Sequence, residues 1–147
     1  MNDIIARLRD KDDKTAYEFA KQIGIESVQS DKYLVMIPEF VKMLNDKSSY
    51  VRTRGFCLIC NQARWADDGQ IEAVFSEMSN LLYDDKPTVV RQCLAALHEV
   101  VLYRPEMTDK IKFTVSKMDL SRYKDSMAPL IEKDKKELLK MLEKRVK

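Results

Sequence analysis

The sequence predicts a single all-α domain built from stacked helical hairpins, and three observations support this prediction. Apolar residues recur with a helical period along the chain, which has only 3 Gly and 4 Pro in 147 residues. Short polar turns, rather than long linkers, separate the periodic segments. Similar segments also return about every 36 to 38 residues, which indicates a repeat protein. We therefore expect one domain over residues 1–147, made of repeated helix pairs.

The turns mark where the individual helices begin. Asp10, Asp46 and Asp84 each open a turn, and the helix that follows starts with a capping residue or a proline. Ser48 or Ser49 can cap one of these helices. The periodic segments predict helices over residues 2–9, 12–24, 33–45, 49–65, 70–83, 87–103, 106–118 and 126–145.

Three segments share a turn and the start of the next helix: LRDKDDKTAYEFA, LNDKSSYVRTRGFC and LYDDKPTVVRQCLA. Their spacing suits one helix pair per repeat, with repeats at about 1–30, 31–66 and 67–104. Residues 105–147 then cap the last repeat, because a terminal unit must cover its neighbour's core and present a polar outer face. The apolar side of this cap is expected to comprise Met127, Leu130, Ile131, Leu138, Met141 and Leu142.

The repeated turn resembles that of HEAT repeats, in which a turn with Asp precedes a helix that opens with Val-Arg. Asp46 with Val51-Arg52, and Asp85 with Val90-Arg91, follow this pattern. The resemblance implies a right-handed α-α superhelix, a short HEAT-like solenoid of about three repeats plus a C-terminal capping helix pair. It also implies that Arg52 and Arg91 bond the turn aspartate of their own or the next repeat, with Asp46 and Asp85 as their natural partners, rather than forming a phosphate site. Pro38 is similar to the proline that kinks the first helix of many HEAT repeats.

The segments SYVRTRGFCLIC, KPTVVRQCLAALHEVV and YKDSMAPLIEKD resemble a small bacterial HEAT family that sometimes carries the iron–sulfur assembly label SufBD. The iron–sulfur scaffold proteins of that name are larger and β-helical, and this helical pattern does not resemble them. The resemblance therefore implies no iron–sulfur cofactor.

The charge balance excludes a strong general attraction to nucleic acid or anionic lipid, because 26 basic residues face 24 acidic ones and the net charge is +2. The first twenty residues are charged throughout, unlike a signal peptide, and no stretch approaches a membrane span. Three cysteines cannot all pair, so they are not a disulfide framework. We expect a cytoplasmic protein without a membrane partner.

Cys57, Cys60, Cys93 and His98 nominally supply four zinc ligands. Cys93 and His98, however, are five residues apart, or about 140° around a helix, so they point in different directions. His98 aligns with the apolar Ile59 and is expected to be buried, with no nucleophile placed beside it by sequence. The sequence thus predicts no metal site, no cofactor and no enzymatic activity.

Arg64, Trp65 and either Asp67 or Asp68 gather aromatic, cationic and acidic groups at the end of one helix. This cluster resembles, in residue types only, the Trp, Arg and Asp with which HEAT-like bacterial alkylpurine DNA glycosylases trap a damaged nucleotide. The alternative, which we favour, is a Trp that closes the end of a hairpin.

The second helix of each pair lines the concave side of a helical solenoid, and only a narrow stripe of it escapes its neighbours. On the helix after the second turn this stripe holds Thr53, Cys57, Cys60 and Arg64. The mixture of aromatic, polar and charged groups suits a protein or peptide partner better than a phosphate backbone. The hypothesis is a non-enzymatic scaffold, the alternative a DNA- or RNA-binding protein. The candidate surface comprises Tyr17, Lys21, Thr53, Cys57, Asn61, Arg64, Trp65, Gln92, Glu99 and Tyr103.

Overall fold

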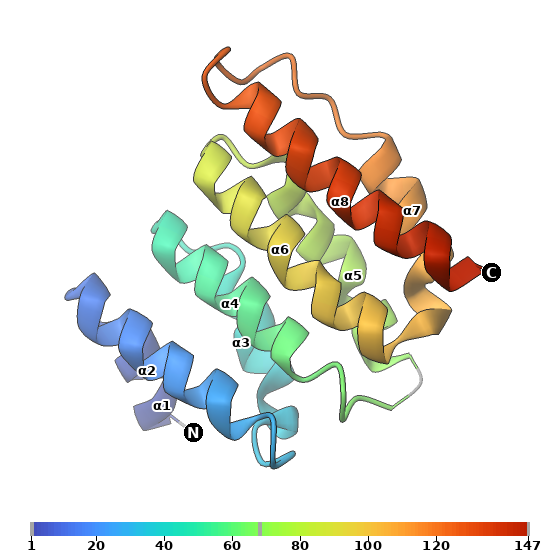
Figure 1. Cartoon of the computed structure of the whole chain (residues 1–147). Helices are drawn as coiled ribbons and strands as arrows, with labels where there is room; N and C mark the ends of the chain where they lie inside the picture. Colours follow the sequence, from blue (N-terminus) through green and yellow to red (C-terminus); the bar gives the residue numbers. More distant parts are fainter. Residues whose placement is uncertain (1, 68, 147) are drawn as a thin grey trace.

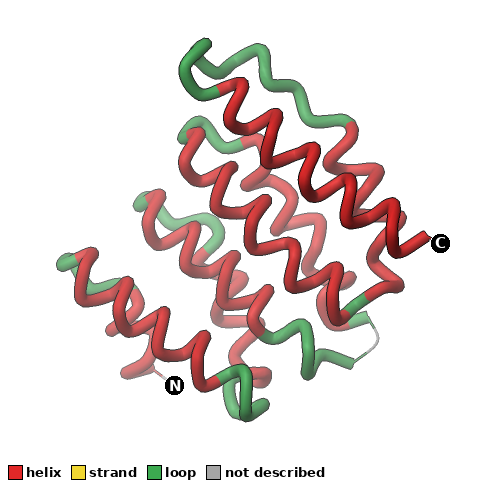
Figure 2. Tube along the Cα trace, in the orientation of Figure 1, coloured by secondary structure: helices red, strands yellow, loops and turns green. Residues whose placement is uncertain are grey.

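The computed structural model describes residues 2–67 and 69–146, and within these ranges the regular structure is entirely helical (Figure 2). In the described residues, eight α-helices lie close to the predicted positions, and three short 3-10 helices precede or follow some of them. The α-helices are α1 (Asn2–Leu8), α2 (Asp13–Glu26), α3 (Ile37–Met43), α4 (Ser49–Asn61), α5 (Gln70–Ser79), α6 (Pro87–Tyr103), α7 (Thr108–Ser116) and α8 (Ala128–Val146). The 3-10 helices are η1 (Leu34–Met36), η2 (Asn80–Tyr83) and η3 (Pro105–Met107).

The helices form two layers. Figure 1 shows α2, α4, α6 and α8 side by side and similarly oriented in one layer, with α1, α3, α5 and α7 behind them. Within the first layer each helix contacts the next, and α1, α3 and α7 each pack on the helix that follows. The predicted all-α stack of hairpins is therefore confirmed. The right-handed sense of the superhelix and the repeat boundaries stay predictions.

The acids at the turns explain why α2, α4 and α6 begin where they do. One carboxylate oxygen of Asp10, Asp46, Asp84 and Asp119 accepts the backbone N–H two residues further on, at 2.9 Å in each case. Such a bond fixes the turn locally, without help from the rest of the fold. Asp119, which the sequence reading missed, forms the same turn after α7, well before α8 begins at Ala128.

Side chains also cap the starts of α2 and α4. Asp12 accepts the backbone N–H of Lys14 and Thr15 at the start of α2, and Ser48 accepts that of Val51 at the start of α4. Ser48, rather than Ser49, is therefore the N-cap of α4. Pro38 was expected to lie within a helix and kink it. Pro38 instead stands in the first turn of α3, directly after η1 ends at Met36, where a proline removes no helical hydrogen bond. The kink itself stays a prediction.

The hairpin of α3 and α4 packs most tightly at Gly55. A Cβ there would lie 2.8 Å from the Cβ of Met43 and 2.8 Å from the backbone oxygen of Phe40. Only a residue without a side chain lets the two helices approach this closely. Phe40 and Phe56 fill the adjoining core with no exposed surface.

The C-terminal segment adds a further helix pair to the stack. Ile131, Leu138 and Leu142 are fully buried where α8 packs on α6 and α7, and Met127 and Met141 are half-buried. Leu130 was placed on the same side but is 39% exposed, because it lies one position off the buried stripe of the helix.

None of the helices in the described part of the chain has both the length and the hydropathy needed to cross a membrane.

Candidate functional site

A groove runs along the first layer between α2, α4 and α6. It consists of two adjoining hollows of about 370 and 580 Å3, which share Tyr17, Thr53, Arg54 and Gln92. The larger lies at the starts of the three helices, and the smaller follows α2 and α4 toward their ends. Volumes of about 300–1,000 Å3 are usual for clefts that bind ligands.

Several residues expected on the concave surface line this groove. Tyr17, Lys21, Cys57, Asn61 and Gln92 all do so. Tyr17 is 60% exposed, and the Asn61 amide donates a hydrogen bond of 2.9 Å to the carboxylate of Glu99. Glu99 thus stands beside the groove and fixes the side chain of Asn61, which lines it.

Thr53 and Cys60 are more enclosed than expected. Thr53 lines the groove but is only 8% exposed, and its hydroxyl donates to the backbone oxygen of Ser49. Cys60 has no exposed surface, so its assignment to the concave stripe is wrong. Because α4 packs between α2 and α6, its free stripe is a single row that continues from Cys57 to Asn61, one helical turn later.

Arg64, Trp65 and Tyr103 do not line either hollow but join neighbouring helix pairs at the helix ends. The Arg64 guanidinium donates to the backbone oxygen of Val28 at 3.1 Å and to the hydroxyl of Tyr103 at 2.7 Å, and it lies 4.5 Å from the centre of the Tyr103 ring. The indole N–H of Trp65 donates to the backbone oxygen of Ser27 at 2.6 Å.

The Trp65 bond has a counterpart one repeat later. The Arg104 guanidinium donates to the backbone oxygen of Ala66 at 2.5 Å, and both bonds span 38 residues. Two different side chains thus bond to equivalent carbonyl groups of the preceding pair. This arrangement agrees with a Trp that closes the end of a hairpin. Asp67 is exposed, and Asp68 lies outside the described residues.

Arg52 bonds the turn aspartate of the next repeat, one of the two expected arrangements, although its partner is not Asp46. Arg52 binds both carboxylate oxygens of Asp84, at 2.9 and 3.1 Å, rather than the carboxylate of Asp46, whose backbone oxygen it contacts at 3.0 Å. The carboxylate of Asp46 lies 3.8 Å from Arg9 instead. Arg52 therefore reaches forward to the turn of the next pair, where the Asp84 side chain is only 9% exposed.

The expected pairing of Arg91 with Asp85 is wrong. Arg91 bonds to Asp134 of α8 at 2.6 Å, and Asp85 lies 3.3 Å from Arg122. The Asp85 side chain is 89% exposed. Along this edge of the stack, an ion pair joins each helix pair to the following one: Arg9 with Asp46, Arg52 with Asp84, and Arg91 with Asp134.

Sequence reasoning missed Arg54, which forms part of the groove wall. Its side chain is 6% exposed and donates to the backbone oxygen of Leu8 at 3.0 Å, and to the backbone and carboxylate oxygens of Asp13 at 3.2 and 3.1 Å. A charge this deeply buried requires such partners. Nothing in its local sequence distinguishes it from Arg52, so only the packing of α1 and α2 reveals its role.

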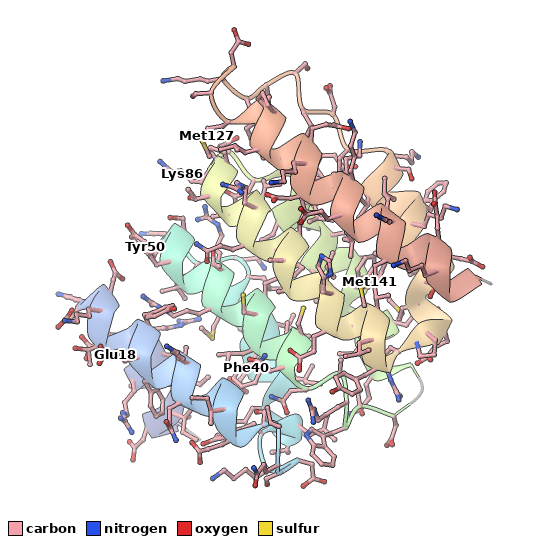
Figure 3. All side chains as sticks on the ribbon, viewed as in Figure 1. Glu18, Phe40, Tyr50, Lys86, Met127 and Met141 are labelled. Atoms are coloured by element: carbon pink, nitrogen blue, oxygen red, sulfur yellow. The ribbon has the colours of Figure 1, made fainter. Side chains whose placement is uncertain are left out.

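The groove's other charges are unpaired. Lys14, Lys21 and Lys86 form no ion pair with any described residue, and Tyr50 is 62% exposed beside them. Figure 3 shows Tyr50 and Lys86 at the same end of α4 and α6. The sequence did not predict Lys14, Tyr50 and Lys86 as groove residues. They stand at the helix starts, outside the predicted stripe.

The three cysteines are free thiols. Burial, with a smaller effect from the charge of Glu99, raises the pKa of Cys57 to about 11. Burial also raises the pKa of Cys60 and Cys93 well above the ordinary value. In the residues that the structure describes, no three His, Cys, Asp or Glu side chains form a group that could hold a metal ion. His98 is half-buried rather than buried as expected.

Stacked antiparallel pairs, Asp turns and arginine bonds between successive pairs define a HEAT-like helical repeat protein. Residues 27–147 match the family Cnd1, described as non-SMC mitotic condensation complex subunit 1. The matched part is most of the chain, which therefore belongs to this family. Comparison with curated proteins and with solved structures gave no match. The family match gives no support to the SufBD label or to the glycosylase resemblance.

Proposed function

We propose that this protein is a non-enzymatic scaffold that holds a segment of a protein or peptide partner in the groove between α2, α4 and α6. The observation that carries the proposal is the contrast within the first layer. The helix ends are bonded to one another, whereas the groove presents exposed aromatic and unpaired cationic side chains, above all Tyr17, Tyr50 and Lys21. Exposed aromatic rings beside polar groups are typical of surfaces that bind proteins.

Membership of the Cnd1 family supports a role in an assembly, since its description names a subunit of a complex. HEAT-like proteins build extended concave surfaces from repeated pairs, and such surfaces suit extended partners. The match begins at residue 27, so α1 and α2 lie outside it. One wall of the groove is therefore supplied by residues that the match does not cover, and the proposal for the groove rests on its own geometry.

The residues around the groove also favour binding over catalysis. Cys57 is the thiol that lines it, and a pKa of about 11 keeps this thiol protonated and weakly nucleophilic near neutral pH. Arg54 and Asp13 are bound to each other. Three free thiols also favour the cytoplasmic location that forms part of the proposal.

Site-specific photo-cross-linking in cell extract tests the proposal. A photo-reactive phenylalanine analogue is placed at Lys21 in the groove or, as the matched control, at Phe113 on α7, which is 65% exposed away from it. The Lys21 position should cross-link to a discrete protein, in nuclease-treated extract as well, and the Phe113 position should not.

Two results would contradict the scaffold function. Equal cross-linking from the two positions would show that the groove has no special role. Cross-links to nucleic acid that disappear with nuclease would instead favour a DNA- or RNA-binding protein, for which affinity should also fall steeply with salt.

A further inference from the structure

The groove has different chemistry at its two ends. The starts of α2, α4 and α6 bring Lys14 and Lys86 beside Tyr50, and Lys21 follows toward the middle. The far end is apolar instead, with Ile25 and Val28 exposed by 57% and 48%. An occupant that fits the whole groove must therefore match both ends.

The charge at the first end is positive and uncompensated. Of the charged residues that line the two hollows, Asp13 and Arg54 are bonded to each other, which leaves three lysines without a partner among the described residues. The whole chain has a net charge of only +2, so this is a local concentration of charge. Complementary charge on a partner fixes its orientation and speeds its association.

The apolar end is open because of Gly24. A Cβ at Gly24 would lie 3.2 Å from the side-chain oxygen of Asn61, and the absence of a side chain leaves the floor between α2 and α4 free. Ile25 and Val28 border this floor, and covering them would remove apolar surface from water.

A phosphate backbone does not match this end. Glu99 is held beside it by its bond to Asn61, and its negative charge contributes to the raised pKa of Cys57. A chain with a negative charge on every unit would place charge both near Glu99 and against Ile25. A polypeptide can instead confine its carboxylates to one end and present an apolar side chain at the other.

We infer that the groove binds an acidic polypeptide segment with an adjacent large apolar side chain. The carboxylates lie at Lys14, Lys21 and Lys86, and the apolar side chain lies over Gly24 between Ile25 and Val28. This inference rests on the proposed scaffold function and adds the chemistry of the bound segment.

Fluorescence anisotropy with synthetic peptides tests the inference on the full chain. The main probe is a Gly-Ser peptide with a run of Glu followed by Leu and Phe. One control replaces its Glu by Lys, a second replaces its Leu and Phe by Ser, and the third is an oligothymidylate. We expect the main probe to bind, both peptide controls to bind at least about tenfold more weakly, and added salt to weaken binding.

Two protein variants have matched charge changes. Lys14→Glu/Lys21→Glu/Lys86→Glu reverses the groove, whereas Lys133→Glu/Lys136→Glu/Lys140→Glu reverses three exposed lysines on α8. We expect about tenfold weaker binding of the main probe, or more, only for the groove variant. Gly24→Leu should fill the apolar end and weaken binding while the lysines remain, with circular dichroism as the check that each variant folds.

The inference is overturned if the main probe fails to bind, or if the Lys or Ser peptide binds as well as it does. It is also overturned if the groove reversal has no effect on a folded protein, or if oligothymidylate binding depends on the groove lysines. A protein that cross-links at position 21 while the acidic probe fails would overturn this inference and leave the scaffold function standing. The same cross-linking from positions 21 and 113 would overturn the scaffold function itself.

Discussion

Cationic and aromatic side chains occur both at the ends of the helices and in the groove, but they are bonded to neighbouring helix pairs at the ends and lie exposed in the groove. At the ends, Arg52, Arg64 and Trp65 each bond to a neighbouring helix pair. Along the groove, Lys14, Lys21 and Lys86 have no such partner among the described residues. A conspicuous side chain is thus a poor guide to function until its partners are known. The comparison predicts that changes at the ends alter stability, whereas changes in the groove alter binding.

The largest expected loss of stability comes from one methyl group at Gly55. Its Cβ would lie 2.8 Å from the Phe40 backbone oxygen and from the Met43 Cβ, so Gly55→Ala must push α3 and α4 apart. We expect a loss of about 3 kcal/mol, as for other overpacked cores. Gly24→Ala is the matched control, because only the Asn61 side chain must move. Equal urea midpoints for the two variants would contradict this packing.

Arg52→Ala should destabilise the protein by about 2 kcal/mol, because it leaves the nearly buried Asp84 carboxylate without its cation. Arg91→Ala should cost about 0.5 kcal/mol, since Arg91 and Asp134 are more exposed and solvent screens them. Chemical denaturation measures both losses. Peptide binding should be unchanged in the folded variants. A larger loss of stability for Arg91→Ala than for Arg52→Ala would contradict this ranking of the two ion pairs.

Trp65→Phe removes the indole donor to Ser27 and keeps an aromatic ring, so we expect a loss of about 1 kcal/mol. Binding to the acidic peptide and to plain or alkylated duplex DNA should be unaffected, and no base should be released. Calorimetry and a base-release assay measure the two effects. Lesion-specific binding that disappears in Trp65→Phe at unchanged stability would assign Trp65 to a nucleotide site instead.

The thiol of Cys57 should be alkylated slowly, and this prediction concerns its reactivity rather than the stability of the fold. A pKa of about 11 in place of 9.0 lowers the thiolate fraction near pH 8 about 100-fold, so alkylation by iodoacetamide should be slower by a similar factor than for a free cysteine. Because the pKa is raised, the rate should climb about tenfold per pH unit and level off only above pH 10. Mass spectrometry identifies the modified residue. A rate that levels off near pH 8 would contradict the burial of this thiol.

Bound peptide should protect Cys57 further, because the thiol lines the groove. We expect the acidic peptide to slow the alkylation of Cys57 and its Lys counterpart to leave the rate unchanged. Equal rates with both peptides would place the binding site elsewhere.

The sequence by itself determined the helices, their turns and the pairing of one helix with the next. These features depend on interactions between residues close in the chain, such as the bond from Asp46 to the N–H of Ser48 and the cap on α4. Helical spacing likewise placed Tyr17 and Lys21 on one face of α2, and the repeat offset placed Gln92 of α6 on the same surface.

Only the tertiary structure decided which side chains find partners. Arg52 meets Asp84 across 32 residues, Trp65 meets Ser27 across 38, and Arg54 meets Leu8 across 46. The offset between neighbouring pairs depends on how α2, α4 and α6 pack, which no local pattern encodes. The same packing buried Cys60 and left the groove lysines unpaired. A side chain's neighbours across the stack, rather than its place on its own helix, determine whether it stabilises the fold or remains available to a partner.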